Sequence, residues 1–252
     1  MKCTFLGTGT SMGVPVAGGF GSDKINGDPR NQRYRCSIWV ETDQTSLIVD
    51  TGPEFRLQTI RSGIKRVDAV LITHEHMDHI AGLDDLRAFN YVQKSAIPLY
   101  TSPRTANSIR QRFSYMFGDD RYPGSTNVDI HETTNPFQVG DLSVTPLVYN
   151  HGKIDVQGYR IGDLSYMTDV KTVPENTKEK VKGSKVLILS GLRWAPEHPT
   201  DLTIPEAVDL AEELEIEQTY LIHMNSYVDH KYSNDKLPKN VKLAYDMLEI
   251  EL

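Results

Sequence analysis

Short runs of apolar and β-branched residues, separated by turn residues, recur along the whole chain and predict β-strands. We expect strands at residues 3–6, 37–41, 46–50, 67–73, 97–101, 142–148, 158–161, 165–168, 186–190, 218–222, 241–244 and 248–252. The run at 67–73 is apolar almost throughout, which is typical of a strand buried on both faces.

Two stretches between these runs repeat their apolar residues with a helical period. One begins at Pro103 and carries Ile109, Phe113 and Met116 on one side, and another begins at Pro205 with apolar residues at 207, 210, 211 and 214. Strands with interspersed helices predict an α/β fold in which two sheets pack face to face with helices outside. Because no repeat, low-complexity tract or linker interrupts the chain, we expect one domain over residues 1–252.

The densest chemistry follows directly after the apolar strand at 67–73. His74, His76, Asp78 and His79 lie within six residues, at the kind of strand end where α/β proteins place functional loops. Imidazole and carboxylate together suit Zn²⁺, Mn²⁺ or Fe²⁺ better than Ca²⁺ or Mg²⁺. A catalytic ion keeps one position open for water, so four close donors exceed what one ion takes. The cluster therefore predicts two metal ions and further ligands elsewhere.

Three later residues meet this expectation, because each follows a predicted strand. They are His151, Asp169 and His223. A single histidine or aspartate at a strand end is most often an ordinary turn residue. Together with the histidine cluster, however, the three complete a set of seven donors for two ions.

The motif at 74–79 resembles the signature His-x-His-x-Asp-His of the metallo-β-lactamase superfamily, and Asp50-Thr51-Gly52 resembles a turn that precedes it there. Residues 7–15, 28–31, 82–87 and 243–246 are similar to a bacterial phosphodiesterase group within that superfamily. The group includes the phosphoribosyl cyclic phosphodiesterase of the carbon–phosphorus lyase pathway, and tRNA 3′-end endonucleases are more distant relatives. The resemblance implies a four-layer αββα sandwich.

The resemblance also implies which residues hold which ion. His74, His76 and His151 would bind the first metal, Asp78, His79 and His223 the second, and Asp169 both. Two Zn²⁺ or Mn²⁺ ions that share a hydroxide stabilise charge on the attacking and the leaving oxygen. This chemistry, with Asp78 in the catalytic set, suits hydrolysis of a small cyclic or nucleotide-like phosphodiester.

One part of the group's pattern is missing. Relatives often carry a structural zinc held by Cys-x-Cys-x-x-Cys in the loop after the first strand and by a later histidine. The corresponding positions here are Gly19, Gly21, Lys24 and Ser226, none of which is a good zinc ligand. We therefore expect no structural zinc, and a mobile or differently ordered loop at 18–27.

The proton donor for the leaving group is less well defined. His198 follows the strand at 186–190, and relatives commonly have a second histidine where Asp201 stands, so His198, Asp201 or neither could serve. Asp50 is expected to orient a ligand histidine from outside the metal sites. His131 and His230 follow no such pattern, and we expect both at the surface.

Four arginines could contact a substrate phosphate, because a guanidinium pairs well with its oxygens. They are Arg30, Arg33, Arg35 and Arg87. The simpler interpretation, which we favour, is that each is solvated or forms a salt bridge.

Composition narrows the function further. The formal net charge of −7 and the lack of a basic stripe argue against long nucleic acids and favour a small substrate. No apolar run of about 18 residues or secretory signal is seen, so we expect no membrane span and a cytoplasmic location. In that compartment Cys3 and Cys36 should be free thiols. The sequence leaves homodimer formation open.

Three other functions fit parts of the pattern. The same metal site could hydrolyse a thioester or a lactone, because it polarises carbonyl groups equally well. An RNA-processing nuclease ranks lower, since no basic insertion that could hold tRNA is present. A metal-binding module without activity ranks lowest, because it would not need all seven donors.

Overall fold

The computed structural model describes residues 1–20, 27–118 and 121–252. Its first sheet has the strand order β14-β1-β2-β3-β4-β5-β6. These strands are β1 (Lys2–Gly7), β2 (Ser37–Glu41), β3 (Ser46–Val49), β4 (Ala69–Leu71), β5 (Ile97–Thr101), β6 (Val128–Glu132) and β14 (Glu249–Glu251). From β14 to β3 neighbours run antiparallel, whereas β3 to β6 are parallel.

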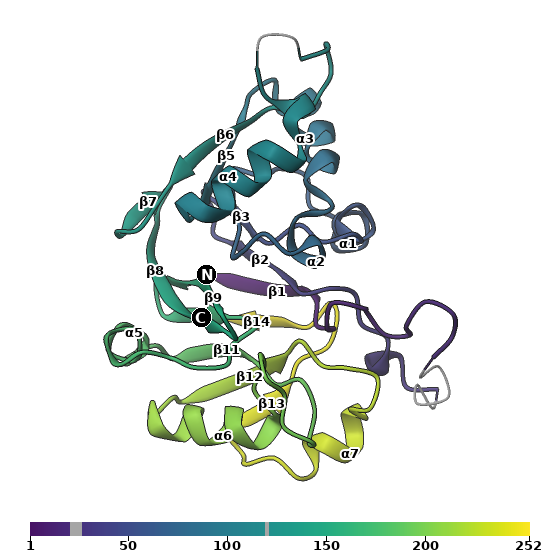
Figure 1. Cartoon of the computed structure of the whole chain (residues 1–252), viewed down its shortest axis with the longest axis vertical. Helices are drawn as coiled ribbons and strands as arrows, with labels where there is room; N and C mark the ends of the chain where they lie inside the picture. The colour runs from purple at the N-terminus through teal and green to yellow at the C-terminus, as the bar shows by residue number, and fades with distance from the viewer. Residues whose placement is uncertain (21–26, 119–120) are drawn as a thin grey trace.

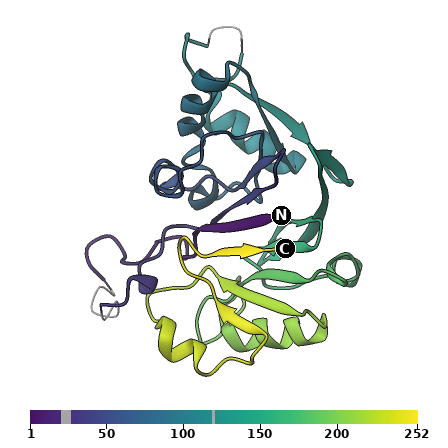
Figure 2. The same ribbon diagram turned by 180° about the vertical axis from the view of Figure 1, so that it is seen from behind.

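The second sheet repeats this mixture with the order β13-β12-β11-β10-β9-β8-β7. Its strands are β7 (Phe137–Val139), β8 (Leu142–His151), β9 (Ile154–Ile161), β10 (Leu164–Met167), β11 (Val186–Ser190), β12 (Gln218–Ile222) and β13 (Val241–Leu243). Strands β10 to β13 are parallel, and β7 to β10 pair antiparallel. The first and last strands of the chain, β1 and β14, lie side by side near the middle of the molecule (Figure 2).

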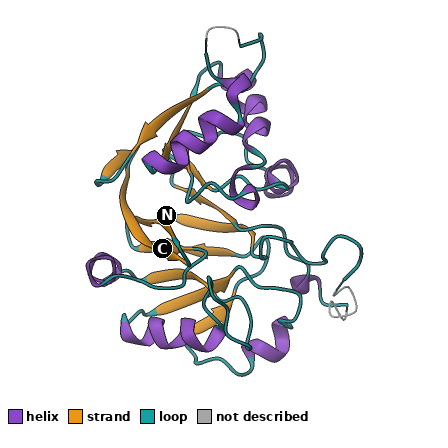
Figure 3. Cartoon of the chain, in the orientation of Figure 1, coloured by secondary structure: helices purple, strands orange, loops and turns teal. Residues whose placement is uncertain are grey.

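The helices cover the outer faces of the two sheets (Figures 1 and 3). They are α1 (Phe55–Ser62), α3 (Arg87–Gln93) and α4 (Pro103–Arg112) beside the first sheet, and α5 (Glu175–Val181), α6 (Ile204–Glu213) and α7 (His230–Asn234) beside the second. A short helix, α2 (Met77–Ile80), follows β4. One apolar cluster, which includes Phe5 and Tyr166, lies between the sheets, and two others lie under the helices. The αββα sandwich expected from the sequence is confirmed.

Strand predictions were most accurate where an apolar run is bounded by turn residues. The bounds of β2, β5, β11 and β12 agree with the predicted ranges. Strand β4 is shorter than predicted, because the Thr73 N–H leaves the ladder and donates to Asp50 Oδ1 at 2.8 Å. Strands β6 and β7 were not predicted, since β6 is a largely exposed edge strand with alternating charges and β7 has three residues.

One histidine prediction was wrong. His230, expected at the surface, is 2% exposed, and its ring lies edge-on to Tyr245 with Nε2 3.0 Å from the Asn234 amide. It opens the short helix α7, which turns it inwards although no apolar pattern marks that helix. Arg33 beside it is also buried and donates to the Val228 carbonyl, whereas His131 is exposed as predicted.

Both cysteines are free and buried, as expected. None of the described helices is long and apolar enough to cross a membrane. The predicted change in the loop at 18–27 falls mainly outside the described residues, which leave out Gly21 and Lys24.

Candidate metal centre

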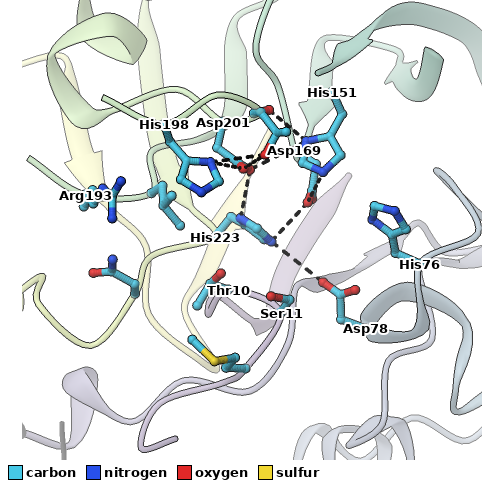
Figure 4. A pocket seen from close by; sticks show the side chains of 14 residues that line it. Thr10, Ser11, His76, Asp78, His151, Asp169, Arg193, His198, Asp201 and His223 are labelled. Carbon is cyan, nitrogen blue, oxygen red and sulfur yellow. Dashed lines mark hydrogen bonds and ion pairs between the residues drawn. The ribbon is translucent and has the colours of Figure 1, made fainter. Parts of the chain in front are cut away.

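The seven predicted donors converge at one edge of the sandwich, where strands of both sheets end. The cluster at 74–79 follows β4, His151 ends β8, and Asp169 and His223 follow β10 and β12. The carboxyl ends of neighbouring parallel strands lie at the same edge, which is where open α/β sheets commonly bind ligands. Residues separated by up to 149 positions are thereby brought into one group (Figure 4).

Four of the donors form one compact group. His79 Nε2 lies 3.1 Å from Asp78 Oδ2 and 3.3 Å from Asp169 Oδ2. His223 Nε2 lies 3.2 Å from Asp169 Oδ1 and 3.8 Å from Asp78 Oδ2. One donor atom from each residue lies within 4.8 Å of the others, so the group has the size of a single cation site.

The remaining histidines, His74, His76 and His151, form a second group beside the first, and the ring of His74 lies 4.2 Å from that of His79. His74 Nε2 is 2.9 Å from His76 Nδ1, and the ring of His76 lies 5.4 Å from that of His151. His151 Nε2 is 3.9 Å from Asp169 Oδ1. Asp169 therefore lies within about 4 Å of Nε2 nitrogens from both groups. Asp201 also lies close to both groups, but it faces the Nδ1 nitrogens of His151 and His223.

Buried polar atoms without partners show that these side chains fit a divalent cation. His79 Nε2 and both ring nitrogens of His223 are fully buried and make no hydrogen bond within the described residues. Buried polar atoms are nearly always satisfied, so unpaired nitrogens beside two carboxylates need an explanation. Imidazole nitrogens and carboxylate oxygens are the ligands that zinc and manganese accept, and a cation there would satisfy them.

Hydrogen bonds from outside the group orient the donor nitrogens inwards. His79 Nδ1 lies 2.8 Å from Asp50 Oδ2, and His151 Nδ1 lies 2.8 Å from the Thr200 carbonyl. When Nδ1–H donates a hydrogen bond to these oxygens, the lone pair of Nε2 faces the centre and is free to bind a metal ion. Asp50 is itself fixed by the Thr73 N–H and hydroxyl, so it has the orienting position expected from the sequence.

Opposite charges hold the group together electrostatically. Burial alone would lower the pKa of His79, but the surrounding carboxylates, led by Asp78, hold it well above its usual value. Burial is again the largest single influence and lowers the pKa of His223, but Asp169, Asp78 and Asp201 together outweigh it and raise this pKa to about 9. Burial opposes ionisation of Asp169, yet His223 and His79 hold the pKa of that carboxyl well below its usual range. Burial and nearby His79 lower the pKa of His74.

The backbone around the site is unusual as well. Asp50, Asp169 and His223 have φ angles of 63°, 56° and 59°, a left-handed conformation that residues other than glycine rarely adopt. Such strain is found mainly at functional sites, where surrounding structure enforces it. Gly52 is required for close packing, because a Cβ there would overlap the carbonyl oxygen of Asp78.

A carboxylate that sequence reasoning considered only as a substitute proton donor has a central position. Asp201 is 3% exposed and its Oδ2 lies 2.9 Å from His198 Nδ1. Its Oδ1 makes no hydrogen bond and lies 3.6 Å from His223 Nδ1 and 3.8 Å from His151 Nδ1. Asp201 lies two residues before Thr203, the N-cap of helix α6, and no sequence pattern marks its contact with His198.

Five of the seven donors, all except His74 and His79, border a pocket of about 330 Å³. His76, Asp78, His198 and Asp201 line it, as shown in Figure 4. The four arginines considered from the sequence do not line this pocket. Arg30, Arg35 and Arg87 pair with Asp28, Glu54 and Asp84 instead, as the simpler interpretation predicted, and Arg33 is buried.

Comparisons with known proteins identify the family of the chain. Residues 45–224 match the family described as the beta-lactamase superfamily domain. A solved structure of a new diphosphatase from the PhnP family is 34% identical with a TM-score of 0.92, over 100% of this chain and 97% of that one.

Two curated relatives are longer than this chain. The octanoyltransferase of Porphyromonas gingivalis is 37% identical over 99% of this chain and 51% of its own length. The exodeoxyribonuclease YycJ of Bacillus anthracis is 25% identical over 60% of this chain and 56% of its own. The chain thus spans about half the length of these relatives.

Proposed function

The chain belongs to the β-lactamase superfamily and is a metal-dependent hydrolase, and from this premise we propose that it cleaves a phosphodiester bond in a small cyclic or nucleotide-like substrate. The observation that carries the proposal is the position of Asp169, within about 4 Å of histidines on both sides. A carboxylate so placed can serve two cations. The likeness to a diphosphatase over the full chain supports a phosphoryl substrate.

We assign the ligands of the two ions from the two groups of side chains that meet at Asp169. His74, His76 and His151 would hold one ion, Asp78, His79 and His223 the other, and Asp169 both. Two bound zinc or manganese ions lower the pKa of a water molecule and neutralise charge on phosphoryl oxygens. The protein's own contribution is to fix the donors, through Asp50 and the Thr200 carbonyl, before substrate arrives.

His198 is proposed as the proton donor to the leaving oxygen. It is about one-third exposed, lines the pocket, and has Nδ1 2.9 Å from the buried carboxylate of Asp201. An Nδ1–H held by Asp201 leaves Nε2 for the substrate, and a carboxylate partner stabilises the protonated ring. Asp201 thereby orients His198 and takes no part in the proton transfer itself.

Thioester hydrolysis is the second candidate, and the octanoyltransferase relative favours it. Acyl transfer and thioester hydrolysis both attack a carbonyl carbon, which a metal site can polarise. The matched part is only 51% of that protein, however, so its activity can reside in the half that this chain does not cover. Phosphodiester cleavage is therefore preferred.

The test is turnover of bis(p-nitrophenyl) phosphate by protein loaded with Zn²⁺ or Mn²⁺, with an octanoyl thioester as the competing substrate. We expect phosphodiester hydrolysis that requires metal and falls by at least about 10³-fold in His76→Ala, because one ion loses a ligand. The matched control is His131→Ala, an exposed histidine outside the pocket, which should keep full activity. No turnover of any phosphodiester at full metal occupancy would refute the proposal.

A further inference from the structure

The pocket extends beyond the metal centre to a cationic end. The residues that border this end are Arg193, Leu192 and Asn225, on the segments that follow β11 and β12. In Figure 4, Arg193 lies beyond His198, on the side of the pocket opposite His76. A substrate whose reacting group lies at the metal centre would therefore present its distal part to Arg193.

The guanidinium of Arg193 is fixed but not neutralised. Nε donates to the Pro196 carbonyl at 2.8 Å and Nη2 donates to the Glu197 carbonyl at 3.2 Å. Both acceptors are uncharged, and no carboxylate of the described chain lies within ion-pair distance of Arg193. By contrast, Arg35 and Arg104 each pair with a glutamate.

Asn225 adds a second donor at the same end. Its Oδ1 accepts the Tyr227 N–H at 3.0 Å, which fixes the orientation of the amide and leaves the Nδ2 hydrogens for a ligand. Its backbone N–H donates to the Leu192 carbonyl, which ties Asn225 to the residue next to Arg193. The pocket thus ends in N–H groups of Arg193 and Asn225 that are free within the described chain, and hydrogen bonds within the protein fix the orientation of both side chains.

We infer that Arg193 and Asn225 form a subsite for a second phosphoryl group of the substrate, distal to the one that is cleaved. The inference rests on the proposed function, which places the reacting phosphoryl group at the metal centre. The chain has a net charge of −7, yet Arg193 is held in the pocket without a carboxylate partner among the described residues. Its positive charge is therefore available to attract an anionic group of the substrate. A guanidinium with an added amide donor suits the several oxygens of a phosphoryl group.

The second phosphoryl group could be a separate monoester or part of a diphosphate, and two substrates distinguish these sources. The first is thymidine 3′-phosphate 5′-(p-nitrophenyl phosphate), compared with its analogue that lacks the 3′-phosphate. The second is ADP-ribose, a diphosphate diester. We expect the wild-type protein to have a lower KM for one of these two than for the analogue with a single phosphoryl group.

Arg193→Gln tests the subsite. We expect it to raise KM for the preferred substrate with two phosphoryl groups by about 10- to 100-fold, with kcat changed little, because the lost contacts bind a group remote from the reaction. KM for the singly charged analogue should not change. Arg193→Lys should recover part of the loss, since it keeps the charge but not the paired donors.

Binding gives an independent readout. Titration calorimetry of the metal-loaded protein with adenosine 5′-(α,β-methylene)diphosphate and with AMP should show that Arg193→Gln weakens binding of the former more strongly. Arg160→Gln is the matched control, because Arg160 also donates only to carbonyl groups but does not line the pocket. Melting temperatures of all variants show whether each is folded.

The outcomes separate the two claims. If the metal-loaded wild-type protein cleaves no phosphodiester at all, including these substrates, the proposed function fails and the subsite fails with it. If it cleaves them but Arg193→Gln leaves every KM unchanged, or lowers kcat equally for all, the subsite alone is refuted. An equal fall in kcat for all substrates would mean that Arg193 acts on the reacting phosphoryl group instead.

Discussion

At the scale of single residues, two of the metal donors have their outer ring nitrogens held by hydrogen bonds. Asp50 and the Thr200 carbonyl hold the outer nitrogens of His79 and His151, so the inner nitrogens face the centre without rearrangement. Loss of such an outer hydrogen-bond partner typically lowers metal affinity or activity by about 10- to 100-fold. Asp201 provides the corresponding support for His198.

The proposed role of His198 predicts a dependence on the leaving group. His198→Ala should lower kcat by about 10²- to 10⁴-fold for an alkyl phosphodiester, because its alkoxide needs a proton, and by much less for a p-nitrophenyl ester, whose phenolate leaves unprotonated. Steady-state kinetics on matched ester pairs measures the difference. Metal content should stay constant, which separates this effect from loss of an ion.

Asp201→Asn is the companion variant. It keeps the shape of the side chain but removes the negative charge beside His198. We expect it to lower kcat for the alkyl ester more than for the p-nitrophenyl ester, and by a smaller factor than His198→Ala does. Equal turnover by wild type and His198→Ala on both ester classes would show that another group donates the proton.

At the residue scale the sequence revealed the donors but not their surroundings. The cluster at 74–79 is recognisable because four donors within six residues have no structural explanation. Asp201 and Arg193 carry no such signal, since a lone carboxylate or arginine after a strand is common. Their roles depend on contacts with His198, His223 and the carbonyls of a turn, which only the folded chain defines.

At the scale of elements, predictions succeeded where local pattern and tertiary role coincide. Strands β5, β11 and β12 are buried or alternate regularly, so the apolar runs bound them correctly. Helix α6 was expected from its apolar period, and Thr203 with Glu206 forms a capping box at its start. The helix begins at Ile204, one residue before the predicted Pro205.

The elements that escaped prediction are those held by their neighbours. Helix α1 has buried polar residues such as Gln58, whose amide donates to the Arg35 carbonyl, and therefore shows no apolar stripe. Helix α3 buries none of its side chains completely. Strand β6 lies at a sheet edge with most residues exposed. Propensity alone cannot identify such segments, because packing or pairing decides their conformation.

At the scale of the whole molecule, a buried polar group connects the two ends of the chain. Asp246, just before the last strand, accepts hydrogen bonds from the Thr8 hydroxyl at 2.8 Å and the Tyr34 N–H at 2.7 Å. Burial raises the pKa of Asp246 to about 7, although these bonds and Arg33 act in the opposite direction. The folded protein therefore keeps this proton over a pH range in which the unfolded chain has lost it.

This predicts a pH-dependent stability. The raised pKa means that the contribution of Asp246 is fully present below pH 4 and is lost as pH rises to about 7. Asp246→Asn, which cannot ionise, should gain stability relative to wild type across that interval, by up to about 1.4 kcal/mol per pH unit. His230, whose pKa burial lowers to about 4, has the opposite sign in both proteins and cancels in the difference.

Urea unfolding in the presence of a chelator, at several pH values between about 4 and 8, measures this difference without interference from metal occupancy. A difference in unfolding free energy that stays constant with pH would mean that Asp246 ionises normally in the folded protein.

The central claim is that two cations share one carboxylate, and a count of bound metal tests it most directly. Native mass spectrometry of the zinc-loaded protein should find two ions per chain in the wild type and fewer than two in Asp169→Asn, because that substitution removes the carboxylate that faces the Nε2 nitrogens of both groups. A wild-type chain that holds a single ion, or an Asp169→Asn chain that still holds two with unchanged affinity, would contradict it.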